Sequence, residues 1–233
     1  MVEIGGRPMI WHIMKYYAFF GVKEFIICCG YKGYIIKEYF ANYLMHSADV
    51  SIDLSSNKIS VHQNNNDHWT IHLIDTGENS LTGGRLRRVR NFLDEDVPFF
   101  FTYGDGLSNI DLLKLKEAHS KSDGTVTVSA VRPPGRFGSL EIQGDKVIEF
   151  REKAETANFW INGGFFVVDY SALDFISGDA DSWESDCLPR ICDNGGLYCY
   201  KHLGFWQPMD TLREKKLLDS MWEEDRAPWK IWV

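Results

Sequence analysis

The stretch Pro98-Phe99-Phe100-Phe101-Thr102-Tyr103-Gly104-Asp105-Gly106 is an apolar run that ends in an aspartate flanked by two glycines. A continuous apolar run is typical of a strand that is buried on both faces, as the strands of parallel sheets are. In an open parallel sheet, ligands bind beyond the carboxyl ends of the strands. The sequence therefore predicts that Asp105 lies at the ligand-binding edge of a parallel sheet.

Helices and strands alternate on the N-terminal side of this stretch. Apolar residues recur at helical spacing over residues 8–20, residues 24–29 form a second apolar run, and residues 35–40 resume helical spacing. Such alternation is typical of βαβ units and of a mostly parallel, Rossmann-like sheet. Short strand-like pieces within residues 49–75 predict a hairpin excursion from that sheet, and the pattern over 83–93 predicts a helix.

The C-terminal half is richer in strands. Strand patterns cover residues 124–131, 160–168 and 197–202, residues 139–151 predict a hairpin, and a helical pattern begins near Asp210. Neither a linker nor a repeat interrupts the chain. We therefore expect an α/β fold with a strand-rich insertion and C-terminal half, built as a single domain over residues 1–233.

The charge balance and the cysteines limit the possible partners. The chain has 33 acidic and 25 basic residues, a net charge of −8, which argues against nucleic acid because phosphate binding needs a basic face. No apolar run approaches the ~20 residues of a membrane span, and the start lacks the pattern of a secretory signal. Five cysteines without a C-x-x-C pair predict buried free thiols in a reducing cytoplasm.

Two aspartates could form a metal site. Glycine on both sides of Asp105 lets a ligand approach the backbone, and Mg²⁺ on a nucleotide phosphate takes one or two carboxylates as ligands. An ordinary Asp-Gly turn explains the same residues. Asp210 is the candidate for the second carboxylate, although taken alone it is better explained as the N-cap of the helix that follows, and the two roles do not exclude each other. The seven histidines show no metal-ligand spacing.

Other segments allow both a functional and a structural interpretation. Lys153 could meet a phosphate and Glu152 sugar hydroxyls, or both could belong to a solvated charge run. The glycines of Asn162-Gly163-Gly164 interrupt a strand, which marks the close approach of a ligand or of backbone. The segment 133–138 could deliver Arg136 and the bare backbone of Gly138 to a ligand, or be a plain loop.

The helix start near residues 75–84 is small and polar. Its backbone N–H groups favour an anion or a base edge, which would engage Gly83 and Gly84, whereas the structural alternative is a helix start capped by Thr82. The arginines that follow are expected to form a solvated face, because the whole chain is acidic.

Together these segments resemble the sugar-1-phosphate nucleotidyltransferases, and in particular their cytidylyl branch. The resemblance runs from residue 1 to residue 233, and its motifs are strong in this order and spacing. The motifs are IGGRPMIWHIM at 4–14, IICCGYKG at 26–33, TGGRL at 82–86, FTYGDG at 101–106, PPGRFG at 133–138, INGGFF at 161–166, GFWQPMDTLR at 204–213 and APWK at 227–230.

The resemblance implies a nucleotidyltransferase fold and a reaction of CTP with α-D-glucose 1-phosphate that yields CDP-glucose and diphosphate. It implies that Asp105 and Asp210 hold Mg²⁺ and that Lys153 meets the sugar phosphate, and these three residues are the catalytic candidates. It also implies a cytoplasmic homo-oligomer, a hexamer in this branch. The implied substrate-binding residues are Gly83, Gly84, Tyr103, Gly104, Arg136, Gly138, Glu152, Asn162 and Gly163.

One departure from the family pattern is large. The family opens with a strand and a glycine-rich loop that grips the triphosphate, and the present sequence begins just after that stretch. On this basis the chain is expected to be N-terminally truncated and, when expressed alone, to be poorly soluble or to bind CTP very weakly. A related enzyme that uses UTP or dTTP, and a non-catalytic binding or regulatory subunit, stay open as alternatives.

Overall fold

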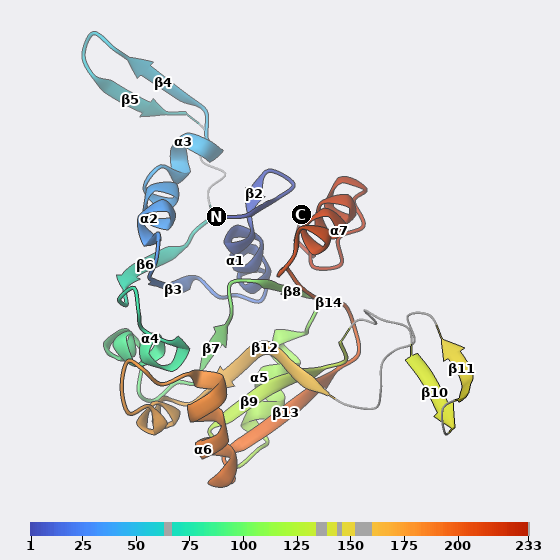
Figure 1. The fold of residues 1–233 in the computed structure, drawn as a ribbon. Helices are drawn as coiled ribbons and strands as arrows, with labels where there is room; N and C mark the ends of the chain where they lie inside the picture. The colour runs from blue at the N-terminus through green and yellow to red at the C-terminus, as the bar shows by residue number, and fades with distance from the viewer. Residues whose placement is uncertain (63–66, 134–138, 144–145, 152–159, 233) are drawn as a thin grey trace.

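The computed structural model describes residues 1–62, 67–133, 139–143, 146–151 and 160–232. In these residues no helix has the length and apolar character needed to cross a membrane. The chain winds helices and strands into the arrangement of Figure 1, with both termini on the side of the molecule that carries α1 and α7.

The N-terminal half contains the βαβ unit that the sequence predicts. Strands β3 (Glu24–Cys29) and β6 (Thr70–Asp75) pair in parallel along their whole length. The other elements here are β1 (Glu3–Ile4), β2 (Arg7–Pro8), α1 (Met9–Phe19), α2 (Gly33–Ala41), α3 (Tyr43–Ser47), β4 (Val50–Asp53), β5 (Lys58–Val61) and α4 (Thr82–Arg88). The helix predicted over 83–93 is shorter than expected and ends at Arg88. Val89 leaves helical geometry because its side chain is buried in the core, and a 3₁₀ turn (Arg90–Phe92) follows it.

The second half is organised around a four-stranded sheet of order β13-β9-β12-β7. Strands β9 and β13 are parallel, and β12 runs antiparallel between β9 and β7. The α/β expectation is therefore confirmed, with one antiparallel strand from the strand-rich half. The elements are β7 (Phe99–Thr102), β8 (Gly106–Ser108), α5 (Leu112–Ser120), β9 (Val126–Val131), β10 (Ser139–Gln143), β11 (Lys146–Arg151), β12 (Ile161–Val168), two short helical turns (Tyr170–Phe175 and Trp183–Cys187), α6 (Leu188–Asp193), β13 (Leu197–His202), β14 (Trp206–Pro208) and α7 (Leu212–Glu223).

Strand β12 separates two hydrophobic cores. Phe165 and Val167 belong to the core that contains α1, α5 and the C-terminal tryptophans, whereas Phe166 and Val168 belong to the core under α4 and α6. Successive side chains of a strand point to opposite faces, so one strand supplies both cores. Helices consequently cover both faces of the sheet, as Figure 1 shows for α5 and α6.

The predicted hairpin excursion is present. Strands β4 and β5 form an antiparallel hairpin that projects away from the body in Figure 1. Ile52 lies opposite Ile59 and Val50 opposite Val61, so these four side chains share one face. Ile52 and Ile59 are 52% and 55% exposed. The hairpin therefore presents an apolar face to solvent.

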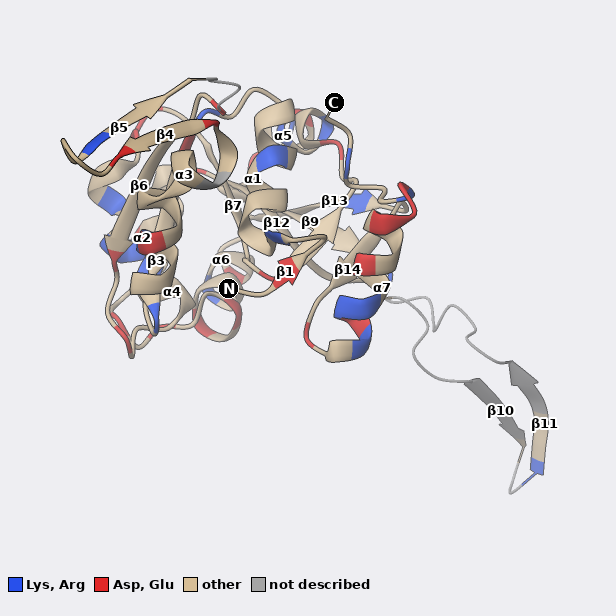
Figure 2. Ribbon diagram, turned by 90° about the horizontal axis from the view of Figure 1, so that it is seen from above, with Lys and Arg blue, Asp and Glu red and all other residues tan. Residues whose placement is uncertain are grey.

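Charges of both signs alternate along α7 in Figure 2, and Lys215 pairs with Asp219 at 2.6 Å on that helix.

The cysteines are all free, as predicted, although Cys192 and Cys199 are exposed rather than buried.

A buried histidine joins the two ends of the chain. His12 on α1 is fully buried, and its Nε2 lies 2.8 Å from the carbonyl oxygen of Ile4. The indole Nε1–H of Trp229 points at Nδ1 from 3.4 Å, and the ring of Trp222 packs edge-on against the imidazole at 4.6 Å. Nδ1 therefore accepts and Nε2 donates, which defines a neutral imidazole. Burial lowers the pKa of His12 from 6.5 to about 4.

This histidine should make folding stability depend on pH. Because the folded-state pKa is depressed, its contribution is present above pH 6.5 and is lost as the pH falls from 6.5 toward 4. The loss should be on the order of 3 kcal/mol. We expect the free energy of unfolding of the unmodified protein, measured with urea, to decrease as the pH falls through this window. The His12→Gln variant should not show this decrease. The exposed His62→Gln is the control and should keep the decline, and an equal decline in His12→Gln would contradict the assignment.

Candidate active site

Two chain segments far apart in sequence bring Asp105 and Asp210 together. Asp105 follows β7, and the next strand, β8, pairs antiparallel with β14, with Gly106 opposite Pro208. The backbone N–H of Met209 donates to the carbonyl oxygen of Asp105 at 2.8 Å. Asp105 is exposed to solvent on one side. The protein around its carboxyl group raises the pKa of that group most, and the negative charge of Asp210 raises this pKa further. Two carboxylates thus face the same region.

Asp210 is not the N-cap of α7, so that alternative from the sequence is wrong. The cap is Thr211, whose side chain accepts from the N–H of Glu214, and the Glu214 carboxylate accepts in return from the N–H of Thr211. This reciprocal capping box satisfies the helix start without the Asp210 carboxylate.

A small pocket opens beside Asp105. A methyl group at Gly104 or Gly106 would meet nothing within 4 Å, so packing does not explain these two glycines. The absence of side chains here leaves the backbone open to a ligand. The pocket is lined by Thr102, Tyr103, Asp105, Gly106, Asn162, Gly163, Gly164, Phe165, Trp206 and Pro208.

The first residues of β12 form the opposite wall of the pocket. Gly164 has a φ of +77°, and a side chain there would meet the ring of Tyr103 at 2.7 Å. The indole of Trp206 donates to the carbonyl oxygen of Gly163 at 2.7 Å. The nearest neighbours of both strand glycines are side chains, that of Tyr103 at Gly164 and those of Ser129 and Val131 at Gly163, where the sequence predicted a ligand or backbone.

Gly83 and Gly84 lie at the start of α4, where both are buried. Each packs against the backbone of residues 179–183: a Cβ on Gly84 would lie 2.3 Å from the Asp179 carbonyl oxygen, and one on Gly83 would lie 2.8 Å from that of Asp181. Close helix-to-loop packing explains both glycines. The expected cap, Thr82, is instead the first residue of the helix, and Leu81 occupies the N-cap position.

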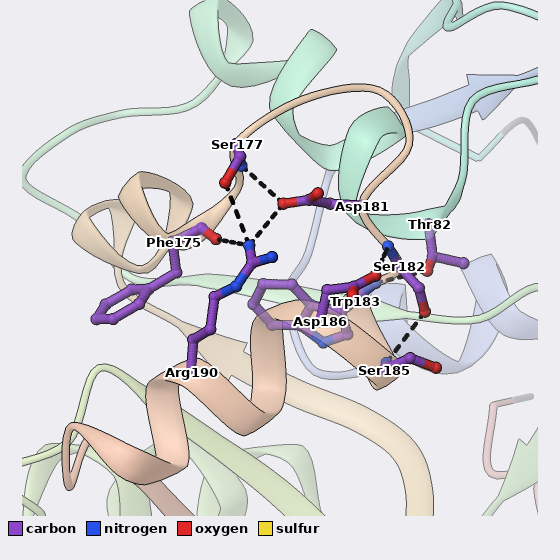
Figure 3. Close-up of polar contacts among 9 residues, drawn as sticks. All are labelled: Thr82, Phe175, Ser177, Asp181, Ser182, Trp183, Ser185, Asp186 and Arg190. Carbon is purple, nitrogen blue, oxygen red and sulfur yellow. Dashed lines mark hydrogen bonds and ion pairs between the residues drawn. The ribbon is translucent and has the colours of Figure 1, made fainter.

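The segment that packs against α4 is held by its own polar contacts (Figure 3). Arg190 donates to the Asp181 carboxylate at 2.7 Å and to the Phe175 carbonyl oxygen at 3.0 Å. The N–H of Trp183 donates to the Thr82 hydroxyl at 2.8 Å, which ties this segment to α4.

Sequence reasoning missed Glu184, which this segment carries. Its carboxylate accepts from the hydroxyls of Thr82 at 2.6 Å and Ser182 at 2.9 Å. The local sequence gave no signal for its contact with Thr82, which lies 102 residues away along the chain. Four predicted site residues, Arg136, Gly138, Glu152 and Lys153, lie outside the described residues.

The residues present fit a divalent cation shared with a phosphate. Among the described residues, no group of three or more His, Cys, Asp or Glu side chains could hold a metal alone. Mg²⁺ needs less, because it is commonly bound by one or two carboxylates together with substrate phosphates. Asp105 and Asp210 provide such a pair.

Comparisons with known proteins define the class. The sequence matches the Nucleotidyl transferase family over residues 1–211, and the chain belongs to this family. It is 49% identical over 232 residues to the glucose-1-phosphate cytidylyltransferase of Salmonella typhi, with 100% of this chain and 90% of that protein covered. It is 35% identical over 233 residues to the probable glucose-1-phosphate cytidylyltransferase of Bacillus subtilis, with 100% and 91% covered.

A solved structure shows the same fold. The crystal structure of HddC from Yersinia pseudotuberculosis matches with a TM-score of 0.69 at 22% identity, over 95% of this chain and 88% of that one. The family and the fold that the motifs predict are therefore confirmed.

The packing of α4 yields a stability prediction. Gly84→Ala places a methyl group against backbone that cannot move aside, and we expect it to lower the free energy of unfolding by ~1–3 kcal/mol. Gly178→Ala, in the same segment, adds a methyl group with nothing within 4 Å and serves as the control. Urea unfolding measures both, and equal stability of the two variants would show that the contact is easily relieved.

Proposed function

We propose that the protein transfers CMP from CTP to α-D-glucose 1-phosphate and releases diphosphate. The observation that carries the proposal is the pairing of β8 with β14, which brings the segment of Asp210 next to Asp105, a residue that lines the pocket. The nucleotide and the sugar come from the names of the relatives, which act as glucose-1-phosphate cytidylyltransferases.

The chemistry is a direct displacement. An oxygen of the sugar phosphate attacks the α-phosphorus of CTP in line, a new P–O bond forms, and the bond to the diphosphate leaving group breaks. Catalysis then consists of positioning the substrates and neutralising charge. Asp105 and Asp210 would hold Mg²⁺, which neutralises the phosphate oxygens when bound.

The remaining residues would orient the two substrates. We assign Lys153 to the phosphate of glucose 1-phosphate, with Glu152, Asn162, Gly163 and Gly138 around the sugar, following the family resemblance. Tyr103, Gly104 and Arg136 complete the substrate-binding set, and Gly83 and Gly84 would lie near the cytosine through their backbone.

The assembly would be a homo-oligomer, a hexamer by the same resemblance. The exposed apolar face of the β4–β5 hairpin supports an association between copies, because an isolated two-stranded hairpin is marginally stable in water. Five free cysteines suit the reducing cytoplasm, where we place the reaction.

Turnover with different nucleotides tests the function. Residues 1–233 preceded by a first strand and glycine-rich loop of the family type, with Mg²⁺ and glucose 1-phosphate, should form nucleotide sugar from CTP at an ordinary enzymatic rate of ~1–10³ s⁻¹. UTP and dTTP should be poorer substrates, as measured by release of diphosphate. Preference for UTP or dTTP would replace CTP in the proposal, and no turnover with any of them would indicate a non-catalytic subunit.

The two aspartates should be needed for metal-dependent turnover. Asp105→Asn and Asp210→Asn should each lower kcat by about 10²-fold or more, because each removes a charge from the proposed metal site. The exposed Asp123→Asn, which lies outside the pocket lining, is the matched control. Steady-state rates over a range of Mg²⁺ concentrations measure the effect. If the Mg²⁺ dependence of the rate were unchanged in both variants, the aspartates would not be metal ligands.

A further inference from the structure

Strand β12 departs from regular pairing at the place where it reaches the pocket. Its register against β9 shifts between Asn162 and Phe166, and its pairing with β7 begins only at Phe165. Gly163 and Gly164 therefore form a bulge, in which Gly164 takes a φ of +77°. The ladder is disrupted at a bulge, so the backbone groups of the extra residues need other partners.

The carbonyl group of Gly163 finds its partner in a side chain. Gly163 is buried, and a buried carbonyl oxygen without a hydrogen bond would destabilise this part of the strand. The indole Nε1–H of Trp206 donates to that oxygen at 2.7 Å. Because the indole nitrogen is a single donor with no capacity to accept, the bond also fixes the edge of the ring.

The backbone around Trp206 is anchored to β8. Trp206 lies opposite Ser108 in the β8–β14 pair. The Ser108 hydroxyl donates to the carbonyl oxygen of Phe205 at 2.6 Å, and the N–H of Asn109 donates to the same oxygen at 3.1 Å. Trp206 also packs against the core that contains α1 and the C-terminal tryptophans. Its indole therefore connects a well-held segment to the bulge of β12.

This connection lies in the pocket itself. Trp206, Gly163 and Gly164 line the pocket together with Asp105, and β14 leads on to Asp210. The indole thus spans the pocket wall from the strand that precedes Asp210 to the bulge whose backbone the proposed function places beside the sugar. Substrate-positioning groups are sensitive to displacements of ~1 Å, so a free Gly163 carbonyl would loosen this wall.

We propose that Trp206 is a positioning residue for sugar recognition: its indole N–H holds the carbonyl oxygen of Gly163 and thereby fixes the bulge of β12 against which the sugar phosphate binds. The inference rests on the proposed function and adds to it a residue that acts through the backbone of another.

Two substitutions separate the donor of Trp206 from its ring. Trp206→Phe keeps an aromatic ring but has no N–H, so the Gly163 carbonyl loses its partner. Trp206→His loses the larger ring, but its Nε2 stands at the same place relative to Cβ as the indole Nε1 and can donate. A role through the hydrogen bond predicts that the histidine variant resembles the unmodified protein more closely, whereas a role in packing predicts the opposite order.

Steady-state kinetics measure the effect in residues 1–233 preceded by a first strand and glycine-rich loop of the family type. We expect Trp206→Phe to raise KM for glucose 1-phosphate by ~3–10-fold, the effect of one hydrogen bond, with KM for CTP nearly unchanged. Trp206→His should stay within ~2-fold of the unmodified KM values, because it retains the donor. Trp69→Phe, on a half-buried tryptophan outside the pocket lining, is the matched control and should change neither KM.

Selectivity among hexose 1-phosphates provides a second readout. The ratio of kcat/KM for glucose 1-phosphate to that for its C2 or C4 epimer does not depend on how much of the protein is folded, because both substrates meet the same preparation. Trp206→Phe should narrow this ratio by ~3–10-fold, since a looser wall distinguishes the hydroxyl positions less well. Trp206→His and Trp69→Phe should keep it.

The outcomes distinguish this inference from the proposed function. If the unmodified protein turns over, unchanged KM and selectivity in Trp206→Phe would overturn the role of Trp206 alone, as would an equal rise in KM for both substrates. Where Trp206→Phe gives no folded protein, Trp206→His decides: KM values near the unmodified ones support the role, and a raised KM for glucose 1-phosphate contradicts it. Failure of the unmodified protein to use glucose 1-phosphate would overturn the proposed function, and this inference with it.

Discussion

The burial of β12 on both faces is the constraint on which the rest of the structure depends. Residues 163–168 of this strand are all buried, and their side chains alternate between the two cores. The strand is also hydrogen-bonded to β9 on one side and β7 on the other. It cannot shift by one residue without exchanging the contents of both cores. Its register therefore determines which residues begin the strand at the pocket, where the Asn162 side chain donates to the Tyr103 hydroxyl at 3.2 Å.

The candidate site depends on contacts between distant segments more than on any single motif. The β8–β14 pairing joins residues 106–108 to 206–208, and β12 supplies the facing wall. The helix start at Thr82 is hydrogen-bonded to Glu184, one hundred and two residues away. A substrate that bridges these segments would meet groups from four parts of the chain. Such a construction places polar groups on a rigid frame, which is what a reaction governed by positioning requires.

Sequence patterns predicted the strands and the edge of the sheet, because apolar runs and glycines act locally. The run before Gly104 and the glycines at 163 and 164 were informative for this reason. Partner choice is not local, so the antiparallel placement of β12 and the contact between Glu184 and Thr82 had no signature in the sequence. Asp210 illustrates the same limit: an aspartate before a helix is usually a cap, and only the neighbouring Thr211–Glu214 box shows that this one is not. For Gly83 and Gly84, close packing and a ligand-binding loop require the same residue type.

The β4–β5 hairpin has a consequence for how this sequence can vary. None of its residues belongs to either core, so the folding of the domain places no demand on Ile52 or Ile59. Random substitution would soon replace exposed isoleucines with polar residues, which cost nothing in the isolated domain and improve its solubility. If these positions stay apolar among descendants of this chain, selection must act through a molecule that covers the hairpin. The apolar residues of the hairpin would then indicate contacts made outside the domain.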